Sequence, residues 1–187
     1  MEKQRLHFNL EIAYYAHCNR NIPINANIAY LCFHSFLSLS PQMLYSICVK
    51  KDFEFIDHTA DIGILAYGKD MKQVFANAAR GLFSIIINLD SVAVKENRDI
   101  QVTAPDREAL LVNWLDELIY LFETKEMLFN KFEITAINDT ELKATAFGEK
   151  INLAKHELKT QVKAATYHML KIEQNKDGYR AQVIFDV

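Results

Sequence analysis

The chain has 187 residues, of which 50% are hydrophobic and 24% are charged. This length and composition are typical of one globular domain and exclude a chain that is disordered throughout. A formal net charge of −3 gives no global basic field, so we expect no direct nucleic-acid binding by the protein alone.

The composition changes near Lys50. Residues 1–50 hold all three cysteines but only six of the 21 Lys and Arg and 24 Asp and Glu side chains, whereas residues 51–187 hold all five glycines. We therefore expect residues 1–50 to be an N-terminal extension that is not part of the folded domain, and residues 51–187 to form that domain. Met43 is a candidate for the true start of the chain.

The apolar pattern of the extension does not predict a membrane span or a signal peptide. Its most apolar run, from Ile28 to Leu39, is about 12 residues long, whereas a membrane helix needs about 20. Glu11 and Arg20 interrupt the region where a signal peptide has its apolar core. The cysteine spacings of 14 and 16 match no zinc or thioredoxin pattern, and an odd number argues against a disulfide framework. We expect reduced thiols, a cytoplasmic location and no membrane association.

The domain opens with two predicted strands, Phe53–Ile56 and Ile62–Tyr67, and then a helix. Asp70 ends the turn after the second strand and is suited to cap this helix. The apolar face of the helix comprises Val74, Ala78, Leu82, Ile85 and Leu89, and its water-facing residues are Lys72, Asn77, Arg80 and Ser84. Gly81 inside the helix costs up to about 1 kcal/mol against alanine, which indicates close packing on the sheet.

A third strand, Asp99–Thr103, precedes a second helix that opens at Pro105-Asp106. Its broad apolar stripe comprises Leu110, Leu111, Trp114, Leu115, Leu118, Leu121 and Phe122. A single tryptophan in such a stripe is expected in the core. Asp116, Glu117 and Glu123 are expected on the solvated face of the helix.

The last third of the domain is predicted to be mostly strands. They are Lys131–Ile137, Glu141–Phe147, Val162–Glu173 and Tyr179–Val187. Asn138-Asp139 predicts a hairpin between the first two, and Asn175–Gly178 predicts a turn between the last two. Gly148–Lys150 and His156-Glu157 are expected in a polar connection between the pairs.

The register of the last two strands depends on the length of the loop between them. A five-residue loop sets Asp186 opposite Thr166, with His168 diagonal to it. A four-residue loop sets Asp186 opposite Tyr167 instead. The sequence leaves both registers open.

A polar cluster, Asp57-His58-Thr59-Ala60-Asp61-Ile62-Gly63, leads directly into the second strand. Two carboxylates, an imidazole and a hydroxyl lie within five residues, and at a strand end such groups can converge on a ligand. In an isolated turn, these side chains more often only hydrogen-bond to the backbone. Further anions at the C-terminal end of the chain favour a ligand site over this interpretation.

The chain terminus supplies two further anions, the Asp186 side chain and the terminal carboxylate of Val187. Adjacent anions on a packed strand need a cation or a donor to offset their charge. Ca²⁺ and Mg²⁺ favour such oxygen ligands, and Asp61 is the natural third carboxylate. Zinc is less favoured, because no two histidines have helical i, i+4 spacing and no cysteine lies in the domain.

Four ordered motifs together resemble the archease family. They are Asp57–Gly63, Phe147-Gly148-Glu149, Lys163-Ala164-Ala165-Thr166-Tyr167-His168 and the terminal Asp186-Val187. The resemblance covers about Asp52 to Val187. It implies an α/β (α+β) fold with an archease-like mixed sheet, an inserted strand–helix–strand module and two main helices.

The resemblance implies an accessory protein and not an enzyme. Archease proteins resemble activators of the RtcB-type tRNA-splicing RNA ligase, which promote ligase guanylylation and multiple turnover in tRNA splicing or RNA repair. The metal-binding positions of the family fall on Asp61, Asp186 and Val187, with Ca²⁺ as the implied cofactor, and its functional lysine matches Lys163. His58 and His168 in the same motifs are further candidates for partner-facing residues. Residues 1–50 depart from the family pattern.

Two other classes of function stay open. A small metal-dependent hydrolase would place His58, His156 and His168 around a carboxylate-bound ion, and it would need an activated water and a base. A small-molecule-binding module would use a cleft between sheet and helix, and an apolar pocket apart from the carboxylates would favour it.

Overall fold

The computed structural model describes residues 51–57, 61–176 and 178–187, so the predicted extension and His58 lie outside the described residues. The strands are β1 (Phe53–Asp57), β2 (Ile62–Gly68), β3 (Glu96–Thr103), β4 (Met127–Ile137), β5 (Glu141–Lys150), β6 (Ala164–Asn175) and β7 (Gly178–Asp186). The helices are α4 (Met71–Ile86), α5 (Arg107–Lys125) and a short 3₁₀ helix, η1 (Leu89–Ser91). The predicted α+β class and the two main helices are confirmed.

The strands form two antiparallel sheets, not one mixed sheet. One sheet has the order β1-β2-β7-β6, and the other has the order β3-β5-β4. Every strand pairing among the described residues is antiparallel. Short connections join β1 to β2, β4 to β5 and β6 to β7, and such connections produce antiparallel pairs. The first and last strands of the domain thus share a sheet, and β3–β5 form an inserted second sheet.

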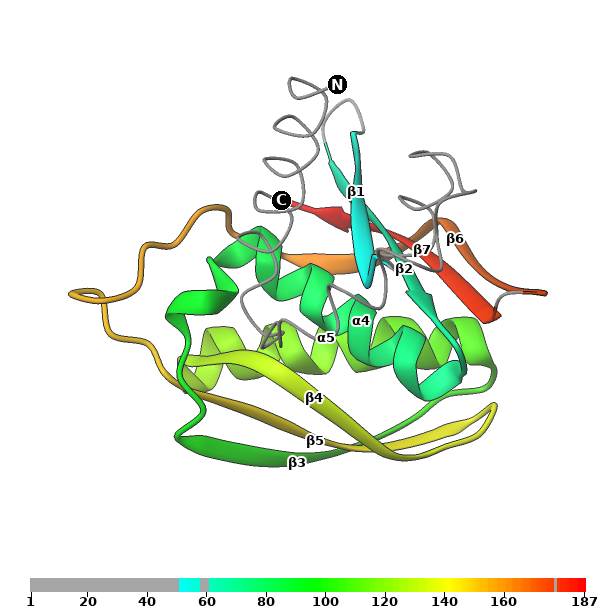
Figure 1. The fold of residues 1–187 in the computed structure, drawn as a ribbon, viewed down its shortest axis with the longest axis horizontal. Helices are drawn as coiled ribbons and strands as arrows, with labels where there is room; N and C mark the ends of the chain where they lie inside the picture. The colour runs from blue at the N-terminus through cyan, green and yellow to red at the C-terminus, as the bar shows by residue number, and fades with distance from the viewer. Residues whose placement is uncertain (1–50, 58–60, 177) are drawn as a thin grey trace, which may run out of the picture. The chain divides into compact units, whose positions relative to one another are not determined.

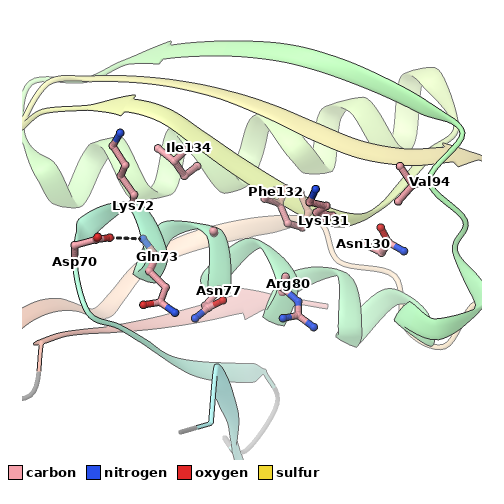
Figure 2. A pocket seen from close by; sticks show the side chains of 11 residues that line it. Asp70, Lys72, Gln73, Asn77, Arg80, Val94, Asn130, Lys131, Phe132 and Ile134 are labelled. Carbon is pink, nitrogen blue, oxygen red and sulfur yellow. Dashed lines mark hydrogen bonds between the residues drawn. The ribbon is translucent and has the colours of Figure 1, made fainter. Parts of the chain in front are cut away.

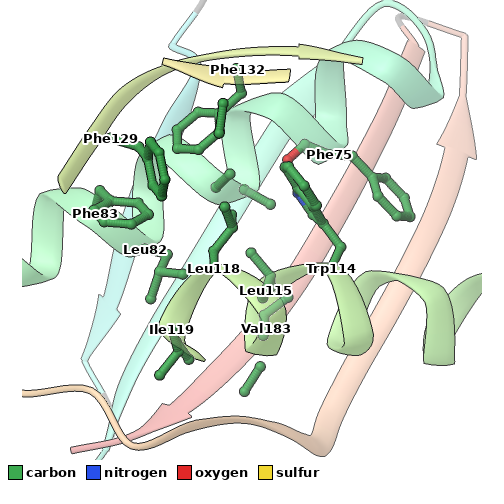
Figure 3. Close-up of a cluster of buried hydrophobic side chains, with 14 of the residues drawn as sticks. Phe75, Leu82, Phe83, Trp114, Leu115, Leu118, Ile119, Phe129, Phe132 and Val183 are labelled. Atoms are coloured by element: carbon green, nitrogen blue, oxygen red, sulfur yellow. The ribbon is translucent and has the colours of Figure 1, made fainter. Parts of the chain in front are cut away.

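Both main helices lie between the two sheets (Figure 1). Helix α4 packs against β2 on one side and β4 on the other, and α5 packs chiefly against β6. Aromatic side chains fill the layer between helices and the three-stranded sheet (Figure 3), where the Phe83 and Phe129 rings lie 5.5 Å apart. Trp114 is fully buried and its Nε1–H donates to the Phe75 carbonyl at 3.2 Å. Its predicted place in the core is confirmed.

Helix α4 begins as predicted but ends earlier. The Asp70 carboxylate accepts from the Gln73 N–H at 2.8 Å, which confirms the N-cap. The predicted water-facing position of Asn77 is wrong, because Asn77 is buried and its amide donates to the Tyr67 carbonyl at 2.7 Å. Leu89 belongs to η1 and not to this helix. Close packing at Gly81 is confirmed, since a Cβ there would lie 2.9 Å from Ile64 Cδ1.

Strand β5 continues to Lys150, so the predicted polar connection at Gly148–Lys150 is wrong. A Cβ on Gly148 would lie 1.7 Å from the Leu128 carbonyl oxygen. The glycine therefore allows the β4 backbone to approach and the strand pair to extend. The hairpin predicted at Asn138-Asp139 is confirmed.

The register of β6 and β7 matches neither predicted alternative. Asp186 pairs with Ala164, and Thr166 pairs with Ile184. The counting failed because the register shifts between Thr166 and Lys171, where β6 carries extra residues.

Candidate functional site

Lys163 lies at the end of the chain. Its Nζ donates to a Val187 carboxylate oxygen at 2.9 Å and lies 3.6 Å from Asp186 Oδ1. Its backbone N–H donates to the Asp186 carbonyl at 2.9 Å. Three of the predicted site residues therefore meet where β6 begins and β7 ends. The side chains of Lys163 and Asp186 are more than half exposed, at 59% and 52%.

The pairing of β2 with β7 directs Asp61 toward the same end of the sheet. Ile62 on β2 pairs with Phe185 on β7, so the next positions outward are Asp61 and Asp186. Residues directly opposite on antiparallel strands have Cβ atoms about 5 Å apart. Continuing the strand alternation by one residue places both carboxylates on the sheet face turned away from the helices. We call Asp61, Lys163, Asp186 and the Val187 carboxylate the terminal cluster.

The terminal cluster combines three carboxylates with one ammonium group. Its carboxylate oxygens suit a hard divalent cation by their chemistry. The Lys163 ammonium contacts Val187 and Asp186 and therefore already offsets part of the negative charge of the cluster. Across residues 51–57, 61–176 and 178–187, no group of three or more His, Cys, Asp or Glu side chains is placed to hold a metal. Ca²⁺ binding by the terminal cluster stays a prediction.

His156 does not belong to the terminal cluster. It is buried, its Nδ1 accepts from the Asn152 N–H at 3.0 Å, and its Nε2 lies 3.2 Å from Glu149 Oε1. Because both ring nitrogens have protein partners, neither offers a lone pair to a metal ion. His168 lies on the exposed part of β6. The structure thus gives the hydrolase alternative no histidine centre within the described part of the chain.

Glu149 is the centre of a buried polar network that the sequence did not predict. Its carboxylate accepts from the Ala93 N–H at 2.7 Å and from Lys95 Nζ at 2.6 Å, and it also binds Lys155 Nζ and His156. The bonds from Lys155 and then Lys95 hold the pKa of the Glu149 carboxyl far below its usual range. The network thereby holds the segment between β5 and Lys163 against β5.

Asp116 was predicted on a solvated face, and this prediction is wrong. Its carboxylate is half-buried and accepts from the Ala165 N–H at 2.8 Å. Burial raises the pKa of this carboxyl. Helix α5 thereby fixes the edge strand β6 two residues after Lys163. No local signal marks this role, because the partner lies 49 residues away.

A groove of about 720 Å³ runs between α4 and β4 (Figure 2). Its lining mixes charged and amide groups, such as Arg80 and Asn130, with apolar side chains such as Phe132. Within the part of the chain that the structure describes, Arg80 Nε and Asn130 Oδ1 are buried and have no hydrogen-bond partner, and both residues line this groove. The groove does not include the terminal cluster. No helix among the described residues is long and apolar enough to span a bilayer.

The described part of the chain is a small α+β domain with two antiparallel sheets, and one end of the four-stranded sheet carries a cluster of carboxylates and a lysine. The chain belongs to the archease family: residues 53–187 match the model of the "Archease protein family (MTH1598/TM1083)". This confirms the resemblance inferred from the four motifs. Residues 1–50 lie outside the match.

Similar proteins cover the same region. The chain is 43% identical to protein archease of Methanosarcina mazei over 141 residues, which is 73% of this chain and 97% of that protein. It is 43% identical to protein archease of Pyrococcus abyssi over 142 residues, covering 73% and 99% of the two chains. The solution structure of protein 1598 of Methanobacterium thermoautotrophicum superposes with a TM-score of 0.64 at 40% identity, covering 73% of this chain and 99% of that one. A crystal structure described as an archease, "possible chaperone", from Thermotoga maritima gives a TM-score of 0.50 at 26% identity, covering 71% and 94%.

Proposed function

We propose that this protein is an accessory activator of an RtcB-type tRNA-splicing RNA ligase and not itself an enzyme. Membership of the archease family supports the proposal. The observation that carries it is the meeting of Lys163 with Asp186 and Val187 in an exposed cluster at the end of the chain. An exposed cluster of this kind is open to a partner protein. The Thermotoga relative is described as a possible chaperone, a role that also acts on other proteins.

Each member of the terminal cluster has a proposed part in promoting ligase guanylylation. Guanylylation transfers a nucleotide phosphate to a ligase histidine, and such transfers need in-line orientation and offset charge. Asp61, Asp186 and the Val187 carboxylate would hold a divalent cation, Ca²⁺, which when bound supplies positive charge to offset phosphate. Lys163 would contact a phosphate or a ligase carboxylate with its ammonium group.

The test is multiple-turnover ligation by a purified RtcB-type ligase with and without this protein. We expect the wild-type chain to raise the rate of ligase guanylylation. Lys163→Ala and Asp186→Ala should remove that stimulation while circular dichroism shows an intact fold. Asp90→Asn is the matched control, because Asp90 is an exposed carboxylate on η1 outside the cluster. Full stimulation by folded Lys163→Ala would contradict the role of the lysine, and the same result for Asp186→Ala would remove the metal from the mechanism.

Small-molecule binding is a second candidate function, and the groove between α4 and β4 favours it. The groove brings the Arg80 guanidinium and the Asn130 amide together with apolar side chains such as Phe132, so a small ligand that carries both polar and apolar groups would fit it. A melting-temperature screen of small carboxylates and amides tests this function. A true ligand should raise the melting temperature of the wild type but not of Arg80→Lys, which keeps the charge and loses the planar guanidinium. Equal shifts in both proteins would contradict the site.

A further inference from the structure

Strand β6 carries a wide bulge at the open edge of its sheet. Thr166 pairs with Ile184 and Lys171 pairs with Gln182, so residues 167–170 lie opposite Val183 alone. We call residues 167–170 the β6 bulge. Gln182 Nε2 donates to the Met169 carbonyl at 3.2 Å, which holds the bulge against β7.

The backbone and the side chains of the β6 bulge are both unusual. Met169 has φ of 54°, a left-handed conformation that is costly for a residue with a long side chain. Tyr167 is 61% exposed and Met169 is 54% exposed, so neither large side chain is buried in the core. The fold therefore maintains a costly conformation that displays apolar groups to solvent. Such strain is retained where it serves a function.

The β6 bulge and the terminal cluster share one edge of the molecule. Ala164 pairs with Asp186, and Tyr167 follows three residues later on the same strand. At about 3.3 Å per residue, the bulge begins about 10 Å from the cluster. β6 is the outermost strand of its sheet, so a partner can reach both features at once.

The terminal cluster alone is poorly suited to provide affinity. Its charges are exposed, and exposed ion pairs contribute little free energy. Binding energy at protein interfaces comes mostly from a few anchors, often aromatic, that enter desolvated pockets. Methionine is also enriched at interfaces because it adapts to irregular apolar surfaces. Tyr167 and Met169 supply such anchors beside the cluster.

We propose that the β6 bulge is the anchor by which this protein binds the ligase, an inference that rests on the proposed function. The bound surface has an apolar depression that receives Tyr167 and Met169. Beside it lies a phosphate or carboxylate that faces Lys163 and the cation which the proposed function assigns to the terminal cluster. The bulge provides affinity, and the terminal cluster provides the effect on guanylylation.

The test uses the full chain and measures its affinity for the ligase separately from its stimulation of guanylylation. Ligase affinity is measured by fluorescence anisotropy, and the guanylylation rate is measured against increasing concentrations of this protein. Tyr167→Ser and Met169→Gly should each raise Kd at least tenfold and leave the rate at saturation within twofold of wild type. Met169→Gly suits the left-handed backbone, so it should delete the side chain without lowering the melting temperature. Tyr120→Ser is the matched control, because Tyr120 is a 51% exposed tyrosine on α5 outside the bulge.

Distinct outcomes overturn the inference and the proposed function. Unchanged Kd in both bulge variants, or an equal rise in Tyr120→Ser, would overturn the anchor while leaving the proposed function intact. A lower guanylylation rate at saturation with unchanged Kd would mean that the bulge acts on the rate, and it would overturn the role of the bulge in affinity. Concentration-dependent dimers that Tyr167→Ser dissociates would make a second copy of this chain the occupant, and RNA binding lost in that variant would make it RNA. A wild-type protein that neither binds nor stimulates the ligase would refute the proposed function itself, and the anchor with it.

Discussion

Asp116 shows how a single side chain positions the terminal cluster from a distance. Its carboxylate accepts the Ala165 N–H, which the outermost strand β6 would otherwise leave without a partner on that side. The start of β6 and Lys163 are thereby fixed to α5.

We expect Asp116→Ala to lower the free energy of unfolding by about 1–3 kcal/mol, because the Ala165 N–H loses its acceptor. Asp116→Asn should cost much less, since its amide oxygen can accept the same bond. The raised pKa of Asp116 means that the folded state disfavours the ionised form, so this site gains stability as pH falls through the folded pKa. Urea unfolding at neutral pH measures both variants. Equal losses for alanine and asparagine would contradict the role of the hydrogen bond.

Glu149 should make the stability of the fold sensitive to acid. Its carboxyl has a pKa far below the ordinary value of 4.5, so its stabilisation is fully present above pH 4.5 and is lost as pH falls through the folded pKa. We expect Glu149→Gln to cost about 2 kcal/mol at neutral pH, because charge-assisted bonds to Lys95 and Lys155 weaken. The difference from wild type should shrink below pH 4.5. Glu141→Gln, at an exposed pair with Lys143, is the control and should change stability far less.

Strand pairing decides whether the predicted metal ligands meet. β2 and β7 pair so that Asp61 and Asp186 are consecutive positions beyond Ile62 and Phe185. The start of β6 adds Lys163 from the other side of β7. The terminal cluster therefore depends on the order β2-β7-β6, which pairs the second strand of the domain with the last one.

If the terminal cluster binds Ca²⁺, the ion should stabilise the folded state by mass action and raise the melting temperature. At a free Ca²⁺ concentration of 100 times Kd, the gain in the free energy of unfolding is about 2.7 kcal/mol. Asp186→Asn should abolish this shift, and a C-terminal extension should do the same because it converts the Val187 carboxylate into an amide. Lys163→Ala should keep the shift or increase it, because the lysine ammonium competes for the same oxygens. Differential scanning calorimetry with and without Ca²⁺ measures these effects. An equal response in wild type and Asp186→Asn would exclude the site.

At the scale of the whole molecule, the family match and the described domain begin at nearly the same point. The match covers residues 53–187, and β1 begins at Phe53. Asp52 is the last residue before β1, and its side chain accepts from Arg80 Nη1 at 2.6 Å on α4. Lys51 Nζ also lies 3.5 Å from Glu54 Oε2, so a chain that begins at Lys51 keeps both contacts.

A truncated protein that begins at Lys51 should therefore fold with nearly unchanged stability. The residues removed are poor in charge and continue no periodic pattern of the domain. Chemical unfolding of the full and truncated chains measures the difference. A loss above about 2 kcal/mol, which normally requires lost core packing, would show that residues 1–50 are structural. Truncation to Phe53 is the informative comparison, because it also removes Asp52 and its bond to Arg80.

The sequence by itself determined the features that depend on near neighbours along the chain. The predicted cap at Asp70 binds an N–H three residues on, and the hairpin at Asn138-Asp139 is equally local. Hydrophobic periodicity correctly placed Trp114 in the core, and the ordered motifs correctly indicated the archease family.

Only the tertiary structure decided the contacts between distant segments. The β6 bulge set Asp186 opposite Ala164, and no turn residue announces extra residues in the middle of a strand. Asp116 accepts from Ala165, 49 residues away, and Glu149 accepts from Ala93, 56 residues away, across surfaces that exist only after the sheets and helices pack. Polar residues in a helix or strand carry the same local pattern whether they face water or a buried N–H. Their role is therefore decided by the packing of distant elements and not by their neighbours in sequence.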